Sequence, residues 1–398
     1  MLTKSLIFLF FLTFPLSAID EFRLWIGPVS VTINLLILAI VMAFFILSYL
    51  IRPTKILIDK DVKFFINLIF LFVIYHLFSC FFSHDINLGG KYVFRIFGSL
   101  LIFVLSYFFA SILIFNEQKF NNLLIIATAS STVFLLIYIY RYAVIFQSPY
   151  LGTEWFFRSE SGKNQLQIYL SIILPVIYYV FLRTKNKTLL IGMFIHIVAA
   201  IYVGSRGLWV SFFIVLTLYF LRYASRFIAT LKISRSLLQN IFGLGTIILV
   251  CILSFSVLSK STGFSPDYFY EKYQSVASLQ PIAGHTNMSM RKEYIFISFN
   301  YLLSHPLFGI GLGNFEYNII RPTHNDYAFF LSDMGIIGFS LFIGIIGYSL
   351  HLFYLRRLPL YLILPFYVNL LFINAYTFPF FWLICGIILG INRKHKVV

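Results

Sequence analysis

Long apolar runs separated by short polar connections extend along most of the chain. A membrane-crossing helix needs about 20 mainly apolar residues, so we interpret each run of roughly that length as one span. The pattern predicts an all-α polytopic membrane protein with about twelve transmembrane helices in a single domain, residues 1–398. The predicted spans are residues 1–18, 29–51, 64–82, 93–115, 123–146, 166–182, 189–203, 208–221, 241–258, 335–355, 358–373 and 379–392.

The first run has two interpretations. Residues 1–18 carry Lys4, an apolar core and a small-residue end at Ser17 and Ala18, a pattern that fits a cleaved signal peptide as well as a retained helix. We adopt the retained helix. Both interpretations leave residues 20–25 outside and start the next span in the same direction.

One polar segment, residues 259–323, is much longer than the others. A segment of this length within a compact fold is more often a lid or binding element than a linker. Within it, MRKEYIFISFNYLL (290–303) has a charged start and many apolar positions, as expected of a helix lying at the membrane interface. We expect a partly helical loop on the outer face that acts as a lid or binding element.

Composition and charge support the membrane interpretation. The chain is 60% hydrophobic and 11% charged, whereas soluble domains are about 25% charged. The net charge of +16 comes mainly from loops that the alternation of spans places inside the cell, which is the positive-inside bias of membrane proteins. We therefore predict a membrane protein with both termini in the cytoplasm and no nucleic-acid partner.

The strongest candidate chemistry lies in residues 305–342, where a polar segment leads into an apolar run. His324 is followed by Asn325 and Asp326, and then by Gly335 and Gly338 at helical spacing. An imidazole can accept a proton from a hydroxyl near neutral pH. The alternative is a histidine that only caps or hydrogen-bonds the start of a helix. The context favours the catalytic interpretation.

Basic side chains on the predicted outer face can bind phosphate. Arg206 lies in a short outer turn, and its planar guanidinium fits phosphate in a bidentate way. Arg291 begins the helical patch of the long loop, Arg321 precedes His324 by three residues, and Lys163 and Asn164 stand at the outer start of a span. The alternatives are interfacial anchoring for the arginines near the membrane and for Lys163, and an ordinary surface charge for Arg291.

Other motifs are interpreted structurally. GIGLG (309–313) lacks the flanking residues of a P-loop and predicts turn geometry. His76 and His196 lie in apolar runs and are taken as hydrogen-bonded core residues, and the three cysteines as small core residues. The sequence contains no HExxH, Asp-x-Asp or Cys/His cluster, so nothing in it supports a metal-assisted reaction or a cofactor.

Together these residues resemble the bacterial O-antigen ligase and O-antigen polymerase family of membrane glycosyltransferases. The resemblance is carried by HPLFGIGLGNF and by His324-Asn325 followed by nine residues and GxxG. Arg206 in GSRG, Arg291 in SMRKEY and the Lys163-Asn164 stretch also match. The matches extend over residues 160–342. The chain has Phe339 and Ser340 after the second glycine, where some ligases carry a threonine or a fuller consensus.

The resemblance implies transfer of a glycan from undecaprenyl diphosphate to a hydroxyl at the periplasmic face of the bacterial inner membrane, with inversion and without metal. It also implies that the long segment 259–323 is a periplasmic loop that covers the active site. Arg206 and Arg291 would hold the diphosphate and stabilise the leaving group, and His324 would orient or deprotonate the acceptor. The substrates would be a lipid-linked glycan donor and either lipid A-core or a second lipid-linked glycan as acceptor. Membrane lipids would surround both.

Alternative functions remain open within and outside this family. A polymerase would extend a lipid-linked chain, and another variant would modify a protein hydroxyl. We place the ligase first because of the His-Asn and GxxG signature. A flippase for lipid-linked glycans is the alternative from another class, although such a transporter is expected to show charged residues along a membrane pathway and paired halves.

Overall fold

The computed structural model describes residues 58–113, 117–140, 161–203, 287–320, 323–372, 375, 376 and 378–391, together with short stretches before residue 48 and positions 208 and 210. The chain forms two compact units, which are described separately. The first unit comprises Met1–Ala39 and Asn121–Leu279, and the second comprises Ile40–Phe120 and Gln280–Val398.

Most predicted spans within the described residues are helices. Five of them are long and apolar enough to cross a membrane: Lys60–Cys80, Ile86–Ser111, Gln118–Ile137, Leu166–Thr184 and Gly335–Leu355. They belong to α3 (Lys60–Cys80), α4 (Ile86–Leu113), α5 (Glu117–Tyr140), α6 (Ser161–Thr184) and α14 (Gly335–Leu355). Shorter apolar helices are α7 (Thr188–Val203) and α16 (Pro379–Ile391). The total of twelve spans stays a prediction, since 208–221, 241–258 and much of the first fifty residues lie almost wholly outside the described part.

One predicted detail is wrong. Residues 358–373 are not one helix but the 3₁₀ turn η4 (Leu360–Leu362) followed by α15 (Leu364–Asn369), because Pro359 and Pro365 lack the N–H that a continuous helix needs. Besides the helices, the described residues include one short hairpin. The strands β1 (Arg23–Ile26) and β2 (Val29–Thr32) form an antiparallel pair with Ile26 opposite Val29, since their sequences RLWI and VSVT are rich in residues that favour strands.

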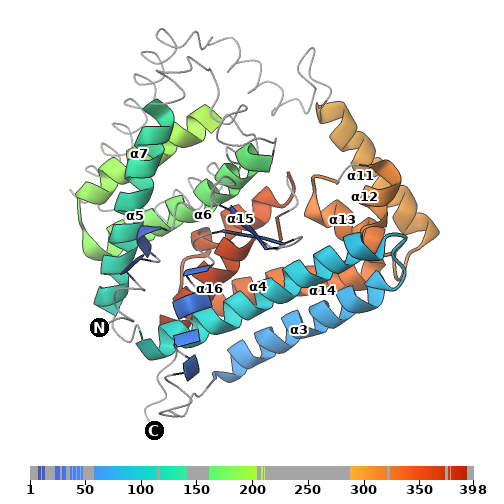
Figure 1. Cartoon of the computed structure of the whole chain (residues 1–398), viewed down its shortest axis with the longest axis horizontal. Coiled ribbons are helices and arrows are strands. Elements are labelled where there is room, and N and C mark those ends of the chain that lie inside the picture. The colour runs from blue at the N-terminus through green and yellow to red at the C-terminus, as the bar shows by residue number, and fades with distance from the viewer. Residues whose placement is uncertain are drawn as a thin grey trace, which may run out of the picture. The chain divides into compact units, whose positions relative to one another are not determined.

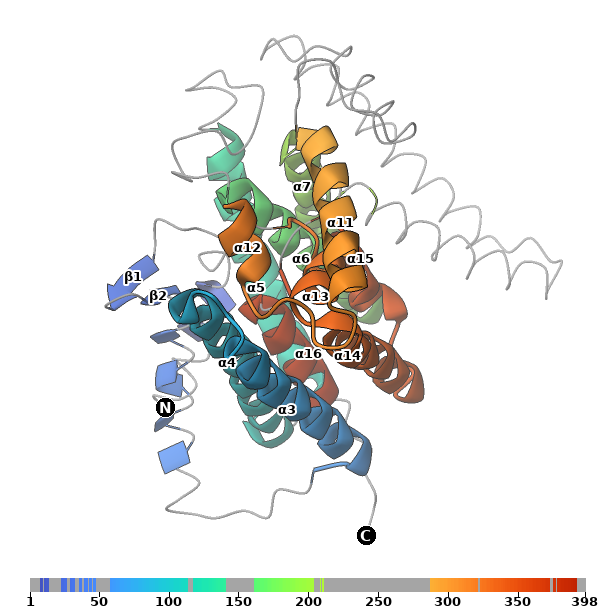
Figure 2. The ribbon, with the colours of Figure 1, turned by 90° about the vertical axis from the view of Figure 1, so that its right-hand side faces the viewer.

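In the second unit, α3 and α4 run antiparallel, joined by a turn over residues 81–85, and α14 packs on α3 while α16 packs on α4 (Figure 1). The same helices are seen in the turned view of Figure 2. The Tyr75 hydroxyl donates to the Met334 carbonyl at 2.9 Å, so α14 starts beside the end of α3. The helix directions therefore agree with the predicted alternation.

Two glycines allow α16 to approach α4 closely. A Cβ on Gly386 would lie 2.6 Å from the Phe103 carbonyl oxygen, and a Cβ on Gly390 would lie 2.5 Å from the Tyr107 carbonyl oxygen. Gly386 and Gly390 are one helical turn apart and form a GxxxG pair, the small-residue pattern by which membrane helices pack backbone to backbone. This contact fixes α16 despite its 13-residue length.

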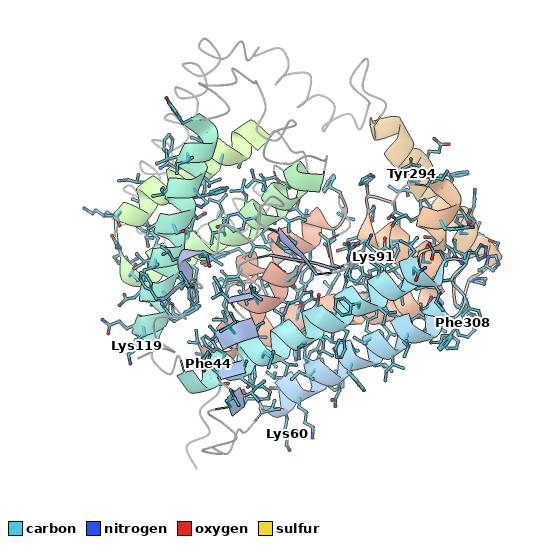
Figure 3. The ribbon with its side chains drawn as sticks, viewed as in Figure 1. Phe44, Lys60, Lys91, Lys119, Tyr294 and Phe308 are labelled. Atoms are coloured by element: carbon cyan, nitrogen blue, oxygen red, sulfur yellow. The ribbon has the colours of Figure 1, made fainter. Side chains whose placement is uncertain are left out.

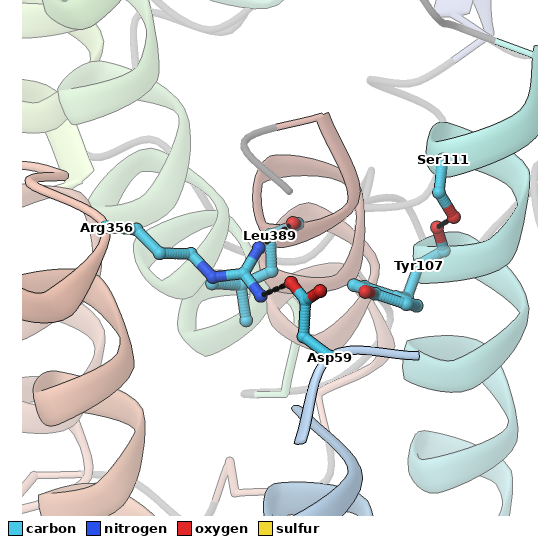
Figure 4. Close-up of polar contacts among 5 residues, drawn as sticks. All are labelled: Asp59, Tyr107, Ser111, Arg356 and Leu389. Carbon is cyan, nitrogen blue, oxygen red and sulfur yellow. Dashed lines mark hydrogen bonds and ion pairs between the residues drawn. The ribbon is translucent and has the colours of Figure 1, made fainter. Parts of the chain in front are cut away.

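An ion pair joins three helices at the opposite end of the second unit (Figure 4). Arg356, at the end of α14, donates from Nη2 to Asp59 Oδ2 at 2.8 Å, and from Nη1 to the Leu389 carbonyl of α16. The side chain of Arg356 is 3% exposed and that of Asp59 is 19% exposed. The pair ties the start of α3 to the ends of α14 and α16.

In the first unit, a buried chain of hydrogen bonds links α5, α6 and α7. His196 Nδ1 lies 2.7 Å from the Gly192 carbonyl, so this nitrogen carries the proton and Nε2 accepts. Ser131 Oγ donates to His196 Nε2 at 2.6 Å, and Tyr169 donates to Ser131 Oγ at 2.7 Å. The interpretation of His196 as a hydrogen-bonded core residue is confirmed.

Candidate functional site

The glycine-rich segment 305–315 folds as a compact turn against the start of α14. Gly309, Gly311 and Gly313 have φ values of 72°, 102° and 83°, which residues with a Cβ rarely adopt. The Ile310 and Gly311 N–H groups donate to the Ser332 and Asp333 carbonyls at 2.9 and 3.0 Å. The prediction of turn geometry is confirmed.

The two glycines of the GxxG motif lie against this turn and its neighbours. Gly335 has a φ of 63°, and a Cβ there would lie 2.5 Å from both the Gly309 nitrogen and the Leu307 carbonyl oxygen. A Cβ on Gly338 would lie 2.9 Å from the Tyr75 ring. The segments 305–315 and 332–338, named the glycine junction below, thus meet backbone to backbone.

A buried carboxylate that the sequence reasoning missed ties the glycine junction together. Asp333 Oδ2 accepts the Gly313 N–H at 2.7 Å, and Oδ1 accepts the Phe315 N–H and the Ser332 hydroxyl at 3.2 Å each. Asp333 is fully buried. The available signal was an acid two residues before the GIIG run, because an ionisable group in an apolar context needs partners.

The pH dependence of stability should report on Asp333. Burial raises its pKa to about 8, with the backbone N–H groups of Gly313 and Phe315 opposing that rise, whereas an unfolded aspartate has a pKa of about 3.9. The folded state then holds a proton that the unfolded state has lost, so the contribution of Asp333 to stability is complete below about pH 4 and is lost as the pH rises through 8. We expect the melting temperature in detergent to fall between about pH 5 and 8, and Asp333→Asn to flatten this fall. An equal slope in both proteins would contradict the assignment.

Asn314 links the glycine junction to the α3–α4 turn. Its Oδ1 accepts the His84 N–H at 2.7 Å, and its Nδ2 donates to the Phe82 carbonyl at 2.9 Å. The Phe308 ring contacts the Phe78 ring in a tilted arrangement, with centroids 5.7 Å apart, beside the end of α3 opposite Lys60 (Figure 3). The junction is therefore anchored to two membrane helices.

His324 directly precedes the cap of the short helix α13 (Asp326–Asp333). Asn325 is the N-cap, and its Oδ1 accepts the Ala328 N–H at 3.1 Å. His324 itself has a φ of 53° and is half-buried. The sequence analysis considered a helix-capping role for His324, and the structure gives that role to Asn325. A half-exposed imidazole on a fixed backbone is suited to exchanging a proton with a bound hydroxyl.

The motif spacing has a structural meaning. The nine residues between Asn325 and Gly335 are the eight residues of α13 followed by Met334. Asn325 begins the helix and Gly335 ends the connection with its positive φ. The pattern therefore specifies a capped short helix that leads into the transmembrane helix α14.

Arg291 lies in α11 (Asn287–Ser304), which packs against α13. Tyr294 and Ser298 of α11 are buried, and Phe315 lies 5.9 Å from Tyr294 between ring centroids. The predicted helical patch in the long loop is confirmed, and a second short helix follows, α12 (Asn314–Ile319). Large apolar side chains of α11 remain exposed, as expected for an interface helix: Ile295, Phe296, Phe299 and Leu303.

The other predicted residues are placed less completely. Arg206 and Arg321 lie outside the described residues. Lys163 and Asn164 lie in the first turn of α6 and belong to the first unit, whereas His324 and Arg291 belong to the second. Among the residues that the structure describes, no group of three metal-ligating side chains is found.

The five long apolar helices, the two-glycine packing of α16 and the capped helix α13 define a multi-pass membrane protein. Residues 191–343 match the family described as O-antigen ligase, which confirms the resemblance seen in the motifs. The matched segment includes Arg206, Arg291 and His324 and ends within α14. A comparison with curated proteins gave no match.

The family determines the coarse biochemical class. The matched family is one of glycosyltransferase-like ligases and polymerases, so the match supports an enzyme.

Proposed function

We propose that this protein is an O-antigen ligase-like glycosyltransferase that moves a glycan from undecaprenyl diphosphate to a hydroxyl of lipid A-core at the periplasmic face of the inner membrane. The observation that carries the proposal is the family match over residues 191–343 with His324, half-exposed, at its motif position before α13. The reaction belongs to lipopolysaccharide biosynthesis and needs no metal or cofactor.

In the proposed mechanism the acceptor oxygen attacks the anomeric carbon and forms the new glycosidic bond. The bond from that carbon to the diphosphate breaks, undecaprenyl diphosphate leaves with the electron pair, and the acceptor proton passes to His324. Arg206 and Arg291 bind the diphosphate and stabilise the charge that develops on it. Arg321, Asn325, Lys163 and Asn164 contribute to substrate binding. Attack from the face opposite the leaving group inverts the anomeric configuration.

A polymerase that transfers the growing chain to a second lipid-linked unit is the closest alternative, since the same family contains both enzymes. The acceptor distinguishes them. A flippase for lipid-linked glycans is the second alternative, and it predicts movement of the glycan between leaflets without a new covalent bond.

The test is transfer by the purified protein with undecaprenyl-diphosphate-linked glycan, in the presence and absence of lipid A-core. Glycan on lipid A-core is the expected product, and its anomeric configuration, read by NMR, should be inverted. We expect His324→Ala to lower the rate at least about 100-fold through loss of general base catalysis. His351→Ala is the matched control, because His351 is exposed on α14 one helix length away from the glycine junction.

Each other outcome has a defined meaning. Longer lipid-linked chains without lipid A-core would identify a polymerase. Full activity of His324→Ala would remove His324 from the mechanism. No transfer to either acceptor, with glycan moving across vesicle membranes, would favour the flippase.

A further inference from the structure

The backbone at His324 is held in an unfavourable conformation. A φ of 53° is uncommon for a residue with a side chain, and it persists only where the surroundings fix it. Local hydrogen bonds shape the turn: the Thr323 hydroxyl donates to the Asn325 carbonyl at 3.0 Å, and Asn325 caps α13 through Ala328. These contacts lie within residues 323–328, so they do not fix where the turn sits in the protein.

Asp326 supplies the long-range attachment, two residues after His324. Its backbone N–H donates to the Leu370 carbonyl at 2.9 Å. Its Oδ2 accepts the N–H groups of Ala375 and Tyr376 at 2.7 and 2.8 Å. The residue is fully buried. Three hydrogen bonds therefore connect the start of α13 to the segment before α16.

Tyr376 extends this attachment into the membrane helix α3. His76 Nδ1 lies 2.8 Å from the Phe72 carbonyl, so Nδ1 carries the proton and Nε2 accepts from the Tyr376 hydroxyl at 3.2 Å. The Tyr376 carbonyl accepts Trp382 Nε1–H at 2.8 Å. His76 is fully buried, which confirms its interpretation as a hydrogen-bonded core residue. Tyr376 thus uses its N–H, carbonyl and hydroxyl in one continuous network.

We propose that Asp326 is the positioning residue for His324, and that the buried Asp326–Tyr376–His76 network fixes the imidazole relative to the membrane helices. The proposal deepens the proposed function and rests on it where catalysis is concerned. Asp326 makes no bond to substrate in this account. It acts by fixing the chain two residues away from the imidazole.

The attachment depends on an oxygen acceptor rather than on a negative charge. Burial raises the pKa of Asp326 well above its usual range, although the N–H groups of Ala375 and Tyr376 oppose that rise. Within the described part of the chain, Asp326 Oδ1 has no hydrogen-bond partner. Asparagine can present its oxygen to the same two N–H groups, whereas leucine of similar size leaves both N–H groups unpaired.

The first measurement follows the position of residue 324 and does not depend on enzymatic activity. Nitroxide labels are placed at His324→Cys and at Phe64→Cys, which is exposed near the other end of α3, in a chain whose three native cysteines are replaced by alanine. The distance distribution between the labels should be narrow with Asp326 and with Asp326→Asn, and about twice as wide with Asp326→Leu. An unchanged width in Asp326→Leu, or equal widening in Asp326→Asn, would overturn the proposal.

The second measurement uses the unlabelled enzyme. Asp326→Leu should lower kcat about 10- to 100-fold with KM for the lipid-linked donor within twofold, because a displacement of about 1 Å has effects of that size. Asp326→Asn should keep kcat near the wild-type value.

If the wild-type protein transfers no glycan, the proposed function fails, while the label distances still test whether Asp326 positions His324. If Asp326→Leu does not yield folded protein, Tyr376→Phe, which removes only the hydroxyl donated to His76, should widen the distribution, and an unchanged width would refute the network.

Discussion

Replacing Gly335 by alanine should abolish most of the folded protein. The new Cβ would lie 2.5 Å from the Gly309 nitrogen and the Leu307 carbonyl oxygen, both backbone atoms that cannot rotate away. The residue also has a φ of 63°, where alanine is strained. Strain and overlap together cost about 3 kcal/mol or more. The measurement is the yield of monodisperse protein in detergent and its melting temperature.

Gly347→Ala is the matched control for this substitution. Gly347 lies in the same helix, α14, and an added Cβ would meet nothing within 4 Å. Alanine favours a helix more than glycine does, so Gly347→Ala should leave the stability unchanged or raise it slightly. Similar yields and melting temperatures for Gly335→Ala and Gly347→Ala would show that folding does not depend on the close backbone contact of Gly335 with Leu307 and Gly309.

Replacing Arg356 by alanine should destabilise the second unit by about 3 kcal/mol, near the lower end of the range for broken buried ion pairs. The substitution leaves Asp59 in a largely buried place without its cation, and leaves the Leu389 carbonyl without a donor. The lower end applies because Asp59 is 19% exposed and keeps some contact with water. Thermal unfolding in detergent measures the effect.

Arg357→Ala separates this effect from a loss of charge on the same loop. Arg357 is the next residue and is exposed, so its removal changes the loop charge equally but breaks no buried pair. The double variant Asp59→Ala with Arg356→Ala should be more stable than Arg356→Ala alone, since no unpaired charge remains. If the loss of stability in the double variant equals the sum of the losses in the two single variants, the ion pair contributes nothing to stability.

The glycine junction explains why its motif can be read in sequence. Glycines with positive φ at 309, 311, 313 and 335 cannot be exchanged for other residues without strain. An asparagine cap and a fixed eight-residue helix set the spacing between His324 and the GxxG pair. Such requirements are local, so they leave a pattern in the sequence.

The sequence by itself determined what depends on composition and local geometry. Apolar runs of sufficient length predicted α3, α4, α5, α6 and α14 because the length of a membrane helix follows from the thickness of the bilayer. The glycines of GIGLG predicted the turn, and the charged start with apolar positions predicted α11. The motifs also gave the family, which the match over residues 191–343 confirmed.

The tertiary structure alone decided which distant groups meet. Asp333 bonds to residues about 20 positions earlier, Asp326 to Ala375 and Tyr376, and Arg356 to Asp59. No periodicity predicts such partners, because a buried polar group is satisfied by whichever donor or acceptor the packing of helices brings near it. The sequence fixes which residues need partners, and the packing of the helices chooses them.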